Sequence, residues 1–183
     1  MLLNLELGKT SRATVWLNEL PAASFHSAKV IETKLATPIA RNPLRSSAAI
    51  ELFIVIGPRQ MYGLLGGTLV PKPLDTTALT LSIPVGASED RFQSTIESVG
   101  ESSMGLPEEY ADSITEGIRR ELLLHPVTSL LKIECAAYNE TSGPLVFDWL
   151  ADILLLLLLD SKRTWASAEL VDLIKRKIRV SRG

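Results

Sequence analysis

Polar and apolar side chains alternate along much of the first half of the chain, and this pattern predicts β-strands. The clearest run extends from Ala48 to Ile56. It is almost continuously apolar, as a central strand should be, and Gly57-Pro58 ends it. The other strands expected from alternation are 2–7, 12–20, 30–35 and 78–85. These segments together predict a β-sheet.

A stretch rich in glycine and proline follows residue 56 and extends to about Pro73. Its centre, Gly63-Leu64-Leu65-Gly66-Gly67-Thr68, superficially resembles a phosphate-binding loop. A P-loop requires a lysine directly after its last glycine and a helix after that, whereas Leu69-Val70-Pro71 follows here. We therefore expect a turn or a flexible hairpin tip at 63–68 rather than a nucleotide site.

The apolar spacing changes to that of helices after residue 106. Pro107 is typical of a first helical turn, and His125-Pro126 ends the helix that follows. The apolar positions recur every four residues, at Tyr110, Ile114, Ile118 and Leu122. Farther on we expect a strand at 129–138, a deeply buried helix at 145–159 and an amphipathic helix at about 165–179 with one apolar face, Leu170, Ile174 and Ile178.

This order of elements predicts an α+β fold, in which a β-sheet has helices packed on one face and an amphipathic helix follows at the C-terminus. A chain of 183 residues can bury a core of its own. We place one α+β domain at 1–160 and a basic C-terminal helix and tail at 161–183. Residues 160–183 hold seven Lys and Arg against three Asp and Glu, so the remaining body is acidic.

The composition is that of an ordinary globular protein, with 46% hydrophobic and 22% charged residues. Cys135 is the only cysteine, so no intramolecular disulfide can form, and the N-terminus lacks the pattern of a signal peptide. The most apolar stretch is too short for a transmembrane helix and carries Asp148 and Asp152. We expect a cytoplasmic protein without a membrane contact.

A search for catalytic chemistry gives no site. The two histidines, His26 and His125, stand far apart and without the spacing of metal ligands, and Cys135 lies inside a predicted strand, where cysteine behaves as a small hydrophobic residue. We expect no catalytic residue, no metal and no cofactor. If an enzyme site exists nevertheless, the candidates for it are Glu19, His26, Asp148 and Asp152.

Charged clusters offer weaker signals. Glu108 and Glu109 suit the positive end of the helix that begins near Pro107, and Asp148 and Asp152 form the polar stripe of an otherwise buried helix. The basic residues near the C-terminus suit the negative end of the last helix and are also candidates for contact with a protein partner or RNA: Lys175, Arg176, Lys177 and Arg179.

Several short motifs resemble domain IV of elongation factor G. They are Leu5-Glu6-Leu7-Gly8-Lys9, leading into Ala13-Thr14-Val15-Trp16-Leu17-Asn18-Glu19; Leu106-Pro107-Glu108-Glu109-Tyr110, with Gly117-Ile118 seven residues after the tyrosine; and Pro126-Val127, ahead of Leu131-Lys132-Ile133-Glu134-Cys135-Ala136-Ala137-Tyr138. The resemblance covers about residues 1–160. It implies the fold of ribosomal protein S5 domain 2, a sheet backed by two helices with a left-handed βαβ crossover.

The same comparison shows departures from that family. The loop that would carry a Gly-Ser-x-His motif is Asn139-Glu140-Thr141-Ser142-Gly143-Pro144, which lacks histidine, and Asn18-Glu19 replaces an Arg-Glu pair. The chain contains no GTPase domain, and the basic last helix lies beyond the matching region. The resemblance therefore favours inheritance of the fold over inheritance of the function.

Three functional hypotheses remain. The first is a non-catalytic binding domain that contacts a protein partner; the second, from the resemblance alone, is a ribosome- or RNA-associated translation factor; the third is an enzyme. The acidic body and the sequence pI of about 5.8 argue against RNA. A dimer is a further expectation, since the leucine run 154–159 could exceed what one small sheet covers.

Overall fold

The computed structural model describes residues 1–37, 43–72 and 77–180. Within them the strands are β1 (Leu2–Glu6), β2 (Arg12–Leu17), β3 (Lys29–Ala36), β4 (Ser46–Ile56), β5 (Arg59–Pro71), β6 (Ala78–Gln93), β7 (Glu101–Leu106) and β8 (Ser129–Tyr138). The α-helices are α1 (Ala111–Leu124), which a short 3-10 turn η1 (Glu108–Tyr110) precedes, α2 (Pro144–Leu159) and α3 (Ser167–Val180). The predicted α+β class is therefore confirmed.

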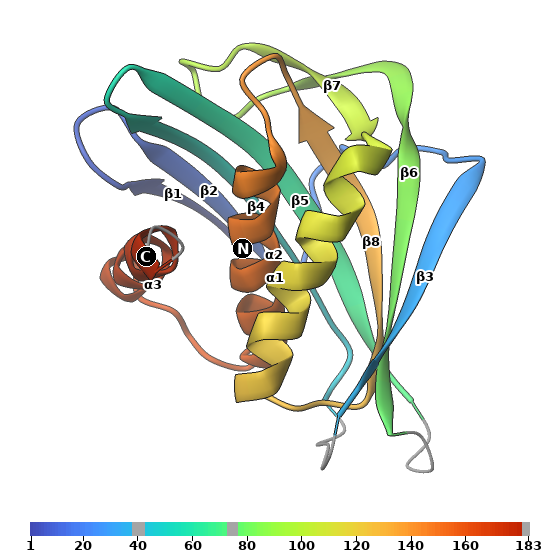
Figure 1. Ribbon diagram of the computed structural model, residues 1–183. Coiled ribbons are helices and arrows are strands. Elements are labelled where there is room, and N and C mark those ends of the chain that lie inside the picture. Colours follow the sequence, from blue (N-terminus) through green and yellow to red (C-terminus); the bar gives the residue numbers. More distant parts are fainter. Residues whose placement is uncertain (38–42, 73–76, 181–183) are drawn as a thin grey trace.

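The strands of the described residues form one eight-stranded sheet in the order β1-β2-β4-β5-β8-β7-β6-β3. Neighbouring strands pair antiparallel, and β8 additionally pairs parallel with the first half of β6. The strand that leads into α1 is β7, and it runs antiparallel to β8. The two edges of the sheet are β1 and β3, on opposite sides of the molecule (Figure 1).

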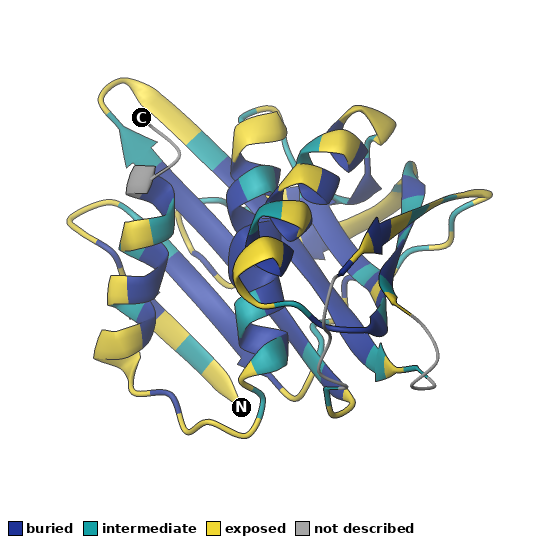
Figure 2. Cartoon of the chain, turned by 60° about the horizontal axis from the view of Figure 1, so that its bottom comes forward, coloured by how far each residue is buried: buried dark blue, intermediate teal, exposed yellow. Residues whose placement is uncertain are grey.

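The three α-helices of the described chain lie on one face of this sheet (Figure 1). α2 packs over β4 and β5, α3 contacts α2 and β1, and α1 packs beside α2 and reaches β3 and β6. The helices are buried toward the sheet and exposed on their outer sides (Figure 2). The predicted apolar faces of α1 and α3 are confirmed, because their residues all join the core: Tyr110, Ile114, Ile118, Leu122, Leu170, Ile174 and Ile178.

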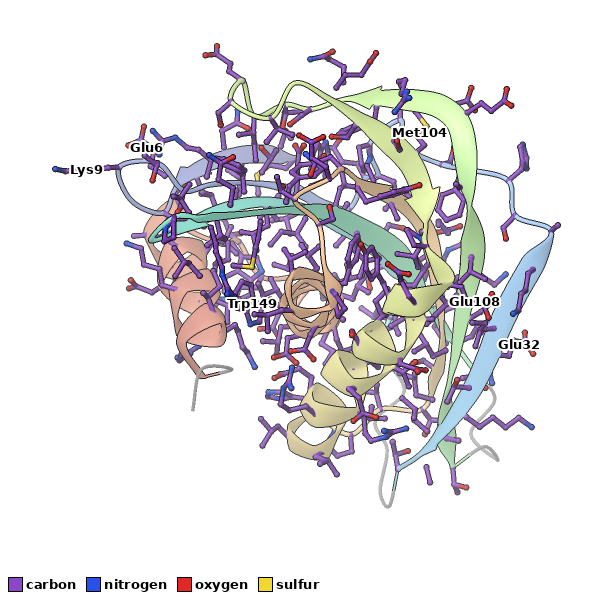
Figure 3. The ribbon with its side chains drawn as sticks, turned by 45° about the horizontal axis from the view of Figure 1, so that its top comes forward. Glu6, Lys9, Glu32, Met104, Glu108 and Trp149 are labelled. Atoms are coloured by element: carbon purple, nitrogen blue, oxygen red, sulfur yellow. The ribbon has the colours of Figure 1, made fainter. Side chains whose placement is uncertain are left out.

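α2 is deeply buried, as the sequence predicts. Trp149 is fully enclosed between this helix and its neighbours (Figure 3). Leu154, Leu155, Leu157 and Leu158 belong to the same core as the sheet. One copy of the chain therefore covers most of the leucine run, which does not supply the dimer contact that we expected from it. Across the described residues, no helix combines the length and the apolar character needed to cross a membrane.

Part of the face of the sheet opposite the helices is covered by extended chain. Residues 18–28 connect β2, near one edge, to β3 at the other edge, and Ser24 forms a bridge with Cys135 on β8. Ala23 of this segment packs with Trp16 and Leu64 in a second apolar cluster. Since the central strands are buried on both faces, their sequences are nearly continuously apolar.

The prediction of a turn or hairpin tip at 63–68 was wrong, because these residues lie in the middle of β5, between β4 and β8. A Cβ atom on Gly66 would come within 2.5 Å of Ala49 Cβ and 2.6 Å of Cys135 Sγ. Glycine is therefore needed here for the close approach of neighbouring side chains. The second half of β6 and all of β7 were also absent from the prediction.

Candidate functional site

A groove of about 750 Å³ lies on the face of the sheet opposite the helices. Its walls come from the β1–β2 hairpin, the end of β4, the start of β5 and the loop between β6 and β7. Glu6 and Lys9 stand at the exposed end of the hairpin (Figure 3). The lining residues are Asn4, Leu5, Glu6, Lys9, Thr10, Arg12, Ala13, Thr14, Phe53, Val55, Gln60, Thr95, Ile96, Glu97 and Ser98.

The β1–β2 hairpin, which forms one wall, is held in place by hydrogen bonds of its own turn. The guanidinium of Arg12 donates to the carbonyl oxygens of Gly8 at 2.7 Å and Ser11 at 3.0 Å. The backbone N–H of Val55 on β4 donates to Ser11 Oγ at 3.0 Å. These contacts join the turn to β4, so this wall of the groove has a defined position relative to the sheet.

A fully buried carboxylate, Glu51 on β4, anchors the opposite wall. Its Oε1 accepts hydrogen bonds from the Tyr62 hydroxyl at 2.9 Å and from Ser94 Oγ at 2.6 Å. Its Oε2 accepts from Thr95 Oγ1 at 2.6 Å and from the Thr95 N–H at 3.3 Å. These hydrogen bonds compensate the carboxylate for its lost hydration, and they fasten residues 94–95 to the sheet.

The network continues from Glu51 to the floor of the groove. Thr14 Oγ1 on β2 lies 2.7 Å from Thr95 Oγ1 and 3.1 Å from Asn4 Oδ1 on β1. Burial, together with the neighbouring Glu51 carboxylate, raises the pKa of Tyr62, so its phenol stays protonated and donates. A chain of hydrogen-bonding groups thus runs from the exposed Asn4 to the buried Glu51.

The surface of the groove combines both charges with an apolar floor. Lys9 and Arg12 line it together with the carboxylates of Glu6 and Glu97. The apolar contribution comes from Phe53 and Ile96, which are buried, and from the half-buried Val55. The lining contains neither histidine nor cysteine. This arrangement offers a ligand hydrogen bonds, ion pairs and apolar contacts.

The basic residues proposed from the sequence lie on α3, on the other side of the sheet from the groove. Arg176 is exposed, Lys175 is half-buried, and the side chain of Arg179 lies outside the described residues. Lys177 binds Glu121 on α1, and only 14% of its side-chain surface is exposed. Of the described members of this set, Arg176 is therefore the most accessible to a partner.

The two aspartates of α2, Asp148 and Asp152, form ion pairs with an arginine side chain of α1. Arg120 on α1 donates to Asp148 Oδ2 at 2.9 Å and, through Nε, to both carboxylate oxygens of Asp152 at 3.2 Å. Burial raises the pKa of Asp152 to about 6, although Arg120 and Lys177 act in the opposite direction. The two aspartates thus link α1 to α2.

The other candidates for an enzyme site do not join these aspartates. Glu19 pairs with the N-terminal ammonium group at 2.8 Å, and His26 and His125 are exposed. Cys135 is buried in β8, and burial raises the pKa of its thiol to about 12, so it is a protonated core residue. Within the described ranges, no group of three or more His, Cys, Asp or Glu side chains is arranged to hold a metal ion.

Sequence reasoning missed the groove and its anchor. Glu51 was included in the predicted strand 48–56 but was not singled out as a candidate. The available signal was a lone carboxylate in an otherwise apolar run, because a buried charge requires compensating partners. Those partners, Tyr62, Ser94 and Thr95, come from segments that nothing in the sequence connects to Glu51.

Comparisons of the chain with protein-family models, with curated proteins and with solved structures found no match.

Proposed function

We propose that this chain is a non-catalytic binding domain that contacts a protein partner through the groove opposite its helices. The observation that carries the proposal is the combination of an open hollow of about 750 Å³ with walls fixed from two directions. Arg12 and Ser11 secure the hairpin wall, and the buried Glu51 secures residues 94–95. A preorganised surface of this kind lowers the entropy lost on binding.

The mixed surface of the groove favours a polypeptide segment as the occupant. An extended segment can place an apolar side chain against Phe53 and Ile96 while its charged or polar groups meet Lys9, Arg12, Glu6 or Glu97. A nucleic-acid backbone would instead bring its phosphates close to the two carboxylates. The formal net charge of −2 for the whole chain supports the same choice.

The runner-up proposal is a ribosome- or RNA-associated factor with an S5 domain 2-like fold, as the resemblance to elongation factor G domain IV implies. Its support is the succession β7, α1, β8 and α2, in which both helices lie on one face of the sheet, together with the close packing of Gly117 on α2. Arg176 and Lys175 on α3 are the basic side chains available to it, since Lys177 is engaged with Glu121.

The two proposals differ in which face of the molecule binds. We would tag three proteins and recover each from its native lysate at low and moderate salt: wild type, a groove variant with Lys9→Glu and Ser98→Trp, and an α3 variant with Lys175→Glu and Arg176→Glu. Lys9, Ser98 and Arg176 are exposed and Lys175 is half-buried, so the substitutions should preserve the fold. Circular dichroism and thermal unfolding would test this for each protein.

A partner that wild type and the α3 variant recover, and that the groove variant loses, would support protein binding through the groove. Ribosomal proteins and RNA that leave as salt rises, and that the α3 variant no longer recovers, would support the runner-up instead. A partner that all three proteins retain would contradict both assignments of the binding face.

A further inference from the structure

The strand β3 has one unpaired edge. It is the terminal strand of the sheet, and within the described residues its only partner is β6, with which Lys29 to Ala36 pair without a register shift. β3 is eight residues long and contains neither proline nor a bulge. The opposite edge strand, β1, has five residues and lies against α3. An unpaired, regular edge such as β3 is a template for a further strand.

The side chains of β3 divide between the two faces of the sheet. Val30, Glu32, Lys34 and Ala36 point to one face and are exposed. Ile31, Thr33 and Leu35 point to the other, where Ile31 and Leu35 pack on the main core. Figure 3 shows Glu32 at the lateral edge of the molecule. Neither Glu32 nor Lys34 has an ion-pair partner among the described residues.

Antiparallel pairing of two β3 strands allows few registers. Residues that lie directly opposite each other in an antiparallel pair point to the same face of the sheet. Even-numbered residues of one β3 strand must therefore lie opposite even-numbered residues of the other, and odd-numbered residues opposite odd-numbered ones. Two registers overlap over seven residues, 29–35 or 30–36. The first places Glu32 opposite Glu32 of the second copy, which brings like charges together.

The register over 30–36 is self-complementary. It is centred on Thr33, and each copy places Glu32 opposite Lys34 of the other, so two ion pairs form across the symmetry axis. On the core face, Ile31 meets Leu35 of the second copy. Charged residues on an edge strand ordinarily prevent pairing because like charges meet. In β3 the spacing of Glu32 and Lys34 disfavours the register over 29–35, in which two glutamates meet, and favours the register over 30–36, in which glutamate meets lysine.

A hollow of about 310 Å³ adjoins the same strand. Its lining includes Lys34, Leu35 and Ala36 of β3 with Leu123 and Pro126 at the end of α1. Leu123 is 79% exposed and Val30 is 51% exposed. In the register over 30–36, residues 34–36 face residues 32–30 of the second copy. Ile31 of that copy, which lies on the core face, would therefore border the hollow and bury apolar surface that one copy leaves open.

We propose that two copies of this chain associate through β3, in an antiparallel, two-fold symmetric pair centred on Thr33, and extend the sheet across the dimer. The interface is isologous, because the same residues of both copies form it, and it therefore closes at two copies. The free backbone groups of β3 gain hydrogen bonds, and the charges of Glu32 and Lys34 set the register. This proposal is independent of the groove, which lies near the other edge of the sheet.

Charge reversal tests the register. We would measure the monomer–dimer equilibrium of wild type, Glu32→Lys, Lys34→Glu and the double variant by analytical ultracentrifugation. Either single reversal makes both cross-strand pairs repulsive and should weaken dimerisation at least about tenfold. The double variant restores both pairs and should return close to wild type. A mixture of the two single variants should form heterodimers, since each supplies the charge that the other lacks.

A cysteine at the symmetry axis gives a second, covalent test. Thr33→Cys should form a disulfide-linked dimer with oxidised glutathione as the oxidant, because residues directly opposite in an antiparallel pair have Cα atoms about 4.5–5.5 Å apart, within the range of disulfide bonds. Ala36→Cys is the matched control, since its two copies would lie near opposite ends of the paired strands. The native Cys135 is buried and does not interfere.

A wild-type protein that stays monomeric at the highest concentration reached would overturn the proposal. So would a dimer that is insensitive to both single reversals, or one in which Ala36→Cys forms the disulfide and Thr33→Cys does not. Circular dichroism spectra and unfolding midpoints equal to wild type exclude misfolding as the cause, and Glu32 and Lys34 are exposed side chains whose reversal should leave the monomer intact.

Discussion

Lys177 on α3 binds the carboxylate of Glu121 on α1, and this ion pair connects the last helix to the first. Only 1% of the Glu121 side-chain surface is exposed. Its second oxygen, Oε2, has no hydrogen-bond partner in the described structure, and His125 Nε2 lies 4.0 Å from it. The buried carboxylate therefore depends on Lys177 for compensation.

Removing Lys177 should leave that charge uncompensated. We expect Lys177→Met to lower the free energy of unfolding by about 3 kcal/mol. Removing one partner of a buried ion pair leaves the other charge buried with nothing to compensate for its lost hydration. Urea denaturation measures the effect. Arg176→Met, an exposed neighbour, is the control and should change stability by less than about 0.5 kcal/mol. Adding Glu121→Gln to Lys177→Met should recover part of the lost stability. Equal stability of Lys177→Met and Arg176→Met would contradict this account.

Asp152 predicts a pH dependence of stability. Its folded-state pKa of about 6 lies above the ordinary value of 3.8, so the folded protein binds this proton more tightly than the unfolded chain. The Asp152 contribution to stability is therefore greatest at pH 4 or below and is lost as the pH rises through about 6. The difference between the two pKa values corresponds to about 3 kcal/mol.

Comparison of wild type with Asp152→Asn isolates the pH-dependent contribution of Asp152 to the free energy of unfolding. The variant cannot titrate at this position, so the difference in unfolding free energy between wild type and variant should change between pH 4 and 7 and stay constant above that range. Denaturant unfolding at several pH values measures it. Asp148→Asn, which alters the less buried partner of Arg120, is the control. A wild-type-minus-variant difference that does not change with pH would exclude a raised pKa at Asp152.

Local patterns predicted most of the elements of this fold. The alternation at 30–35, the apolar run at 48–56 and the four-residue spacing from Tyr110 to Leu122 each arise from burial of one face or of both, and the structure confirms them. β5 was missed because Gly66 and its neighbours serve close strand packing, and glycine residues required for packing have the same sequence pattern as glycine residues required for a turn.

The site depended on long-range contacts that sequence periodicity does not contain. The sequence placed Asp148 and Asp152 on one helical face, yet nothing in it assigned Arg120 of another helix to them. Glu51 was within a predicted strand, but its donors Ser94 and Thr95 lie 43 and 44 residues further along the chain. The groove requires the second of these relationships, between Glu51 and residues 94–95, so it became visible only in the folded structure.

Glu51 should be important for both stability and the wall of the groove. We expect Glu51→Ala to lower the free energy of unfolding by about 2–4 kcal/mol, because buried donors lose their common acceptor. Tyr62→Phe removes one of those hydrogen bonds and should cost about 1 kcal/mol. Hydrogen exchange should rise in residues 94–96 of Glu51→Ala and remain near wild type in α3. Unchanged exchange at 94–96 would show that Glu51 does not hold this segment.

Gly117 should behave unlike an ordinary glycine in a helix. Gly→Ala inside a helix usually stabilises by about 1 kcal/mol. Here a Cβ atom would lie 2.6 Å from the carbonyl oxygen of Asp148 and 2.9 Å from Ala151 Cβ on α2. Because backbone cannot yield as a flexible side chain does, we expect Gly117→Ala to destabilise by about 1–3 kcal/mol.

Gly143 provides the matched control for Gly117. It is the N-cap residue of α2, has an extended backbone, and would place a Cβ atom in open space. Its helix lacks a side-chain capping bond, so Gly143→Ser should stabilise by about 0.5 kcal/mol. Opposite signs for the two substitutions in thermal and urea unfolding would show that contact between α1 and α2 requires glycine at 117. If Gly117→Ala also stabilises, the two helices can separate without cost, and the packing between α1 and α2 does not limit stability.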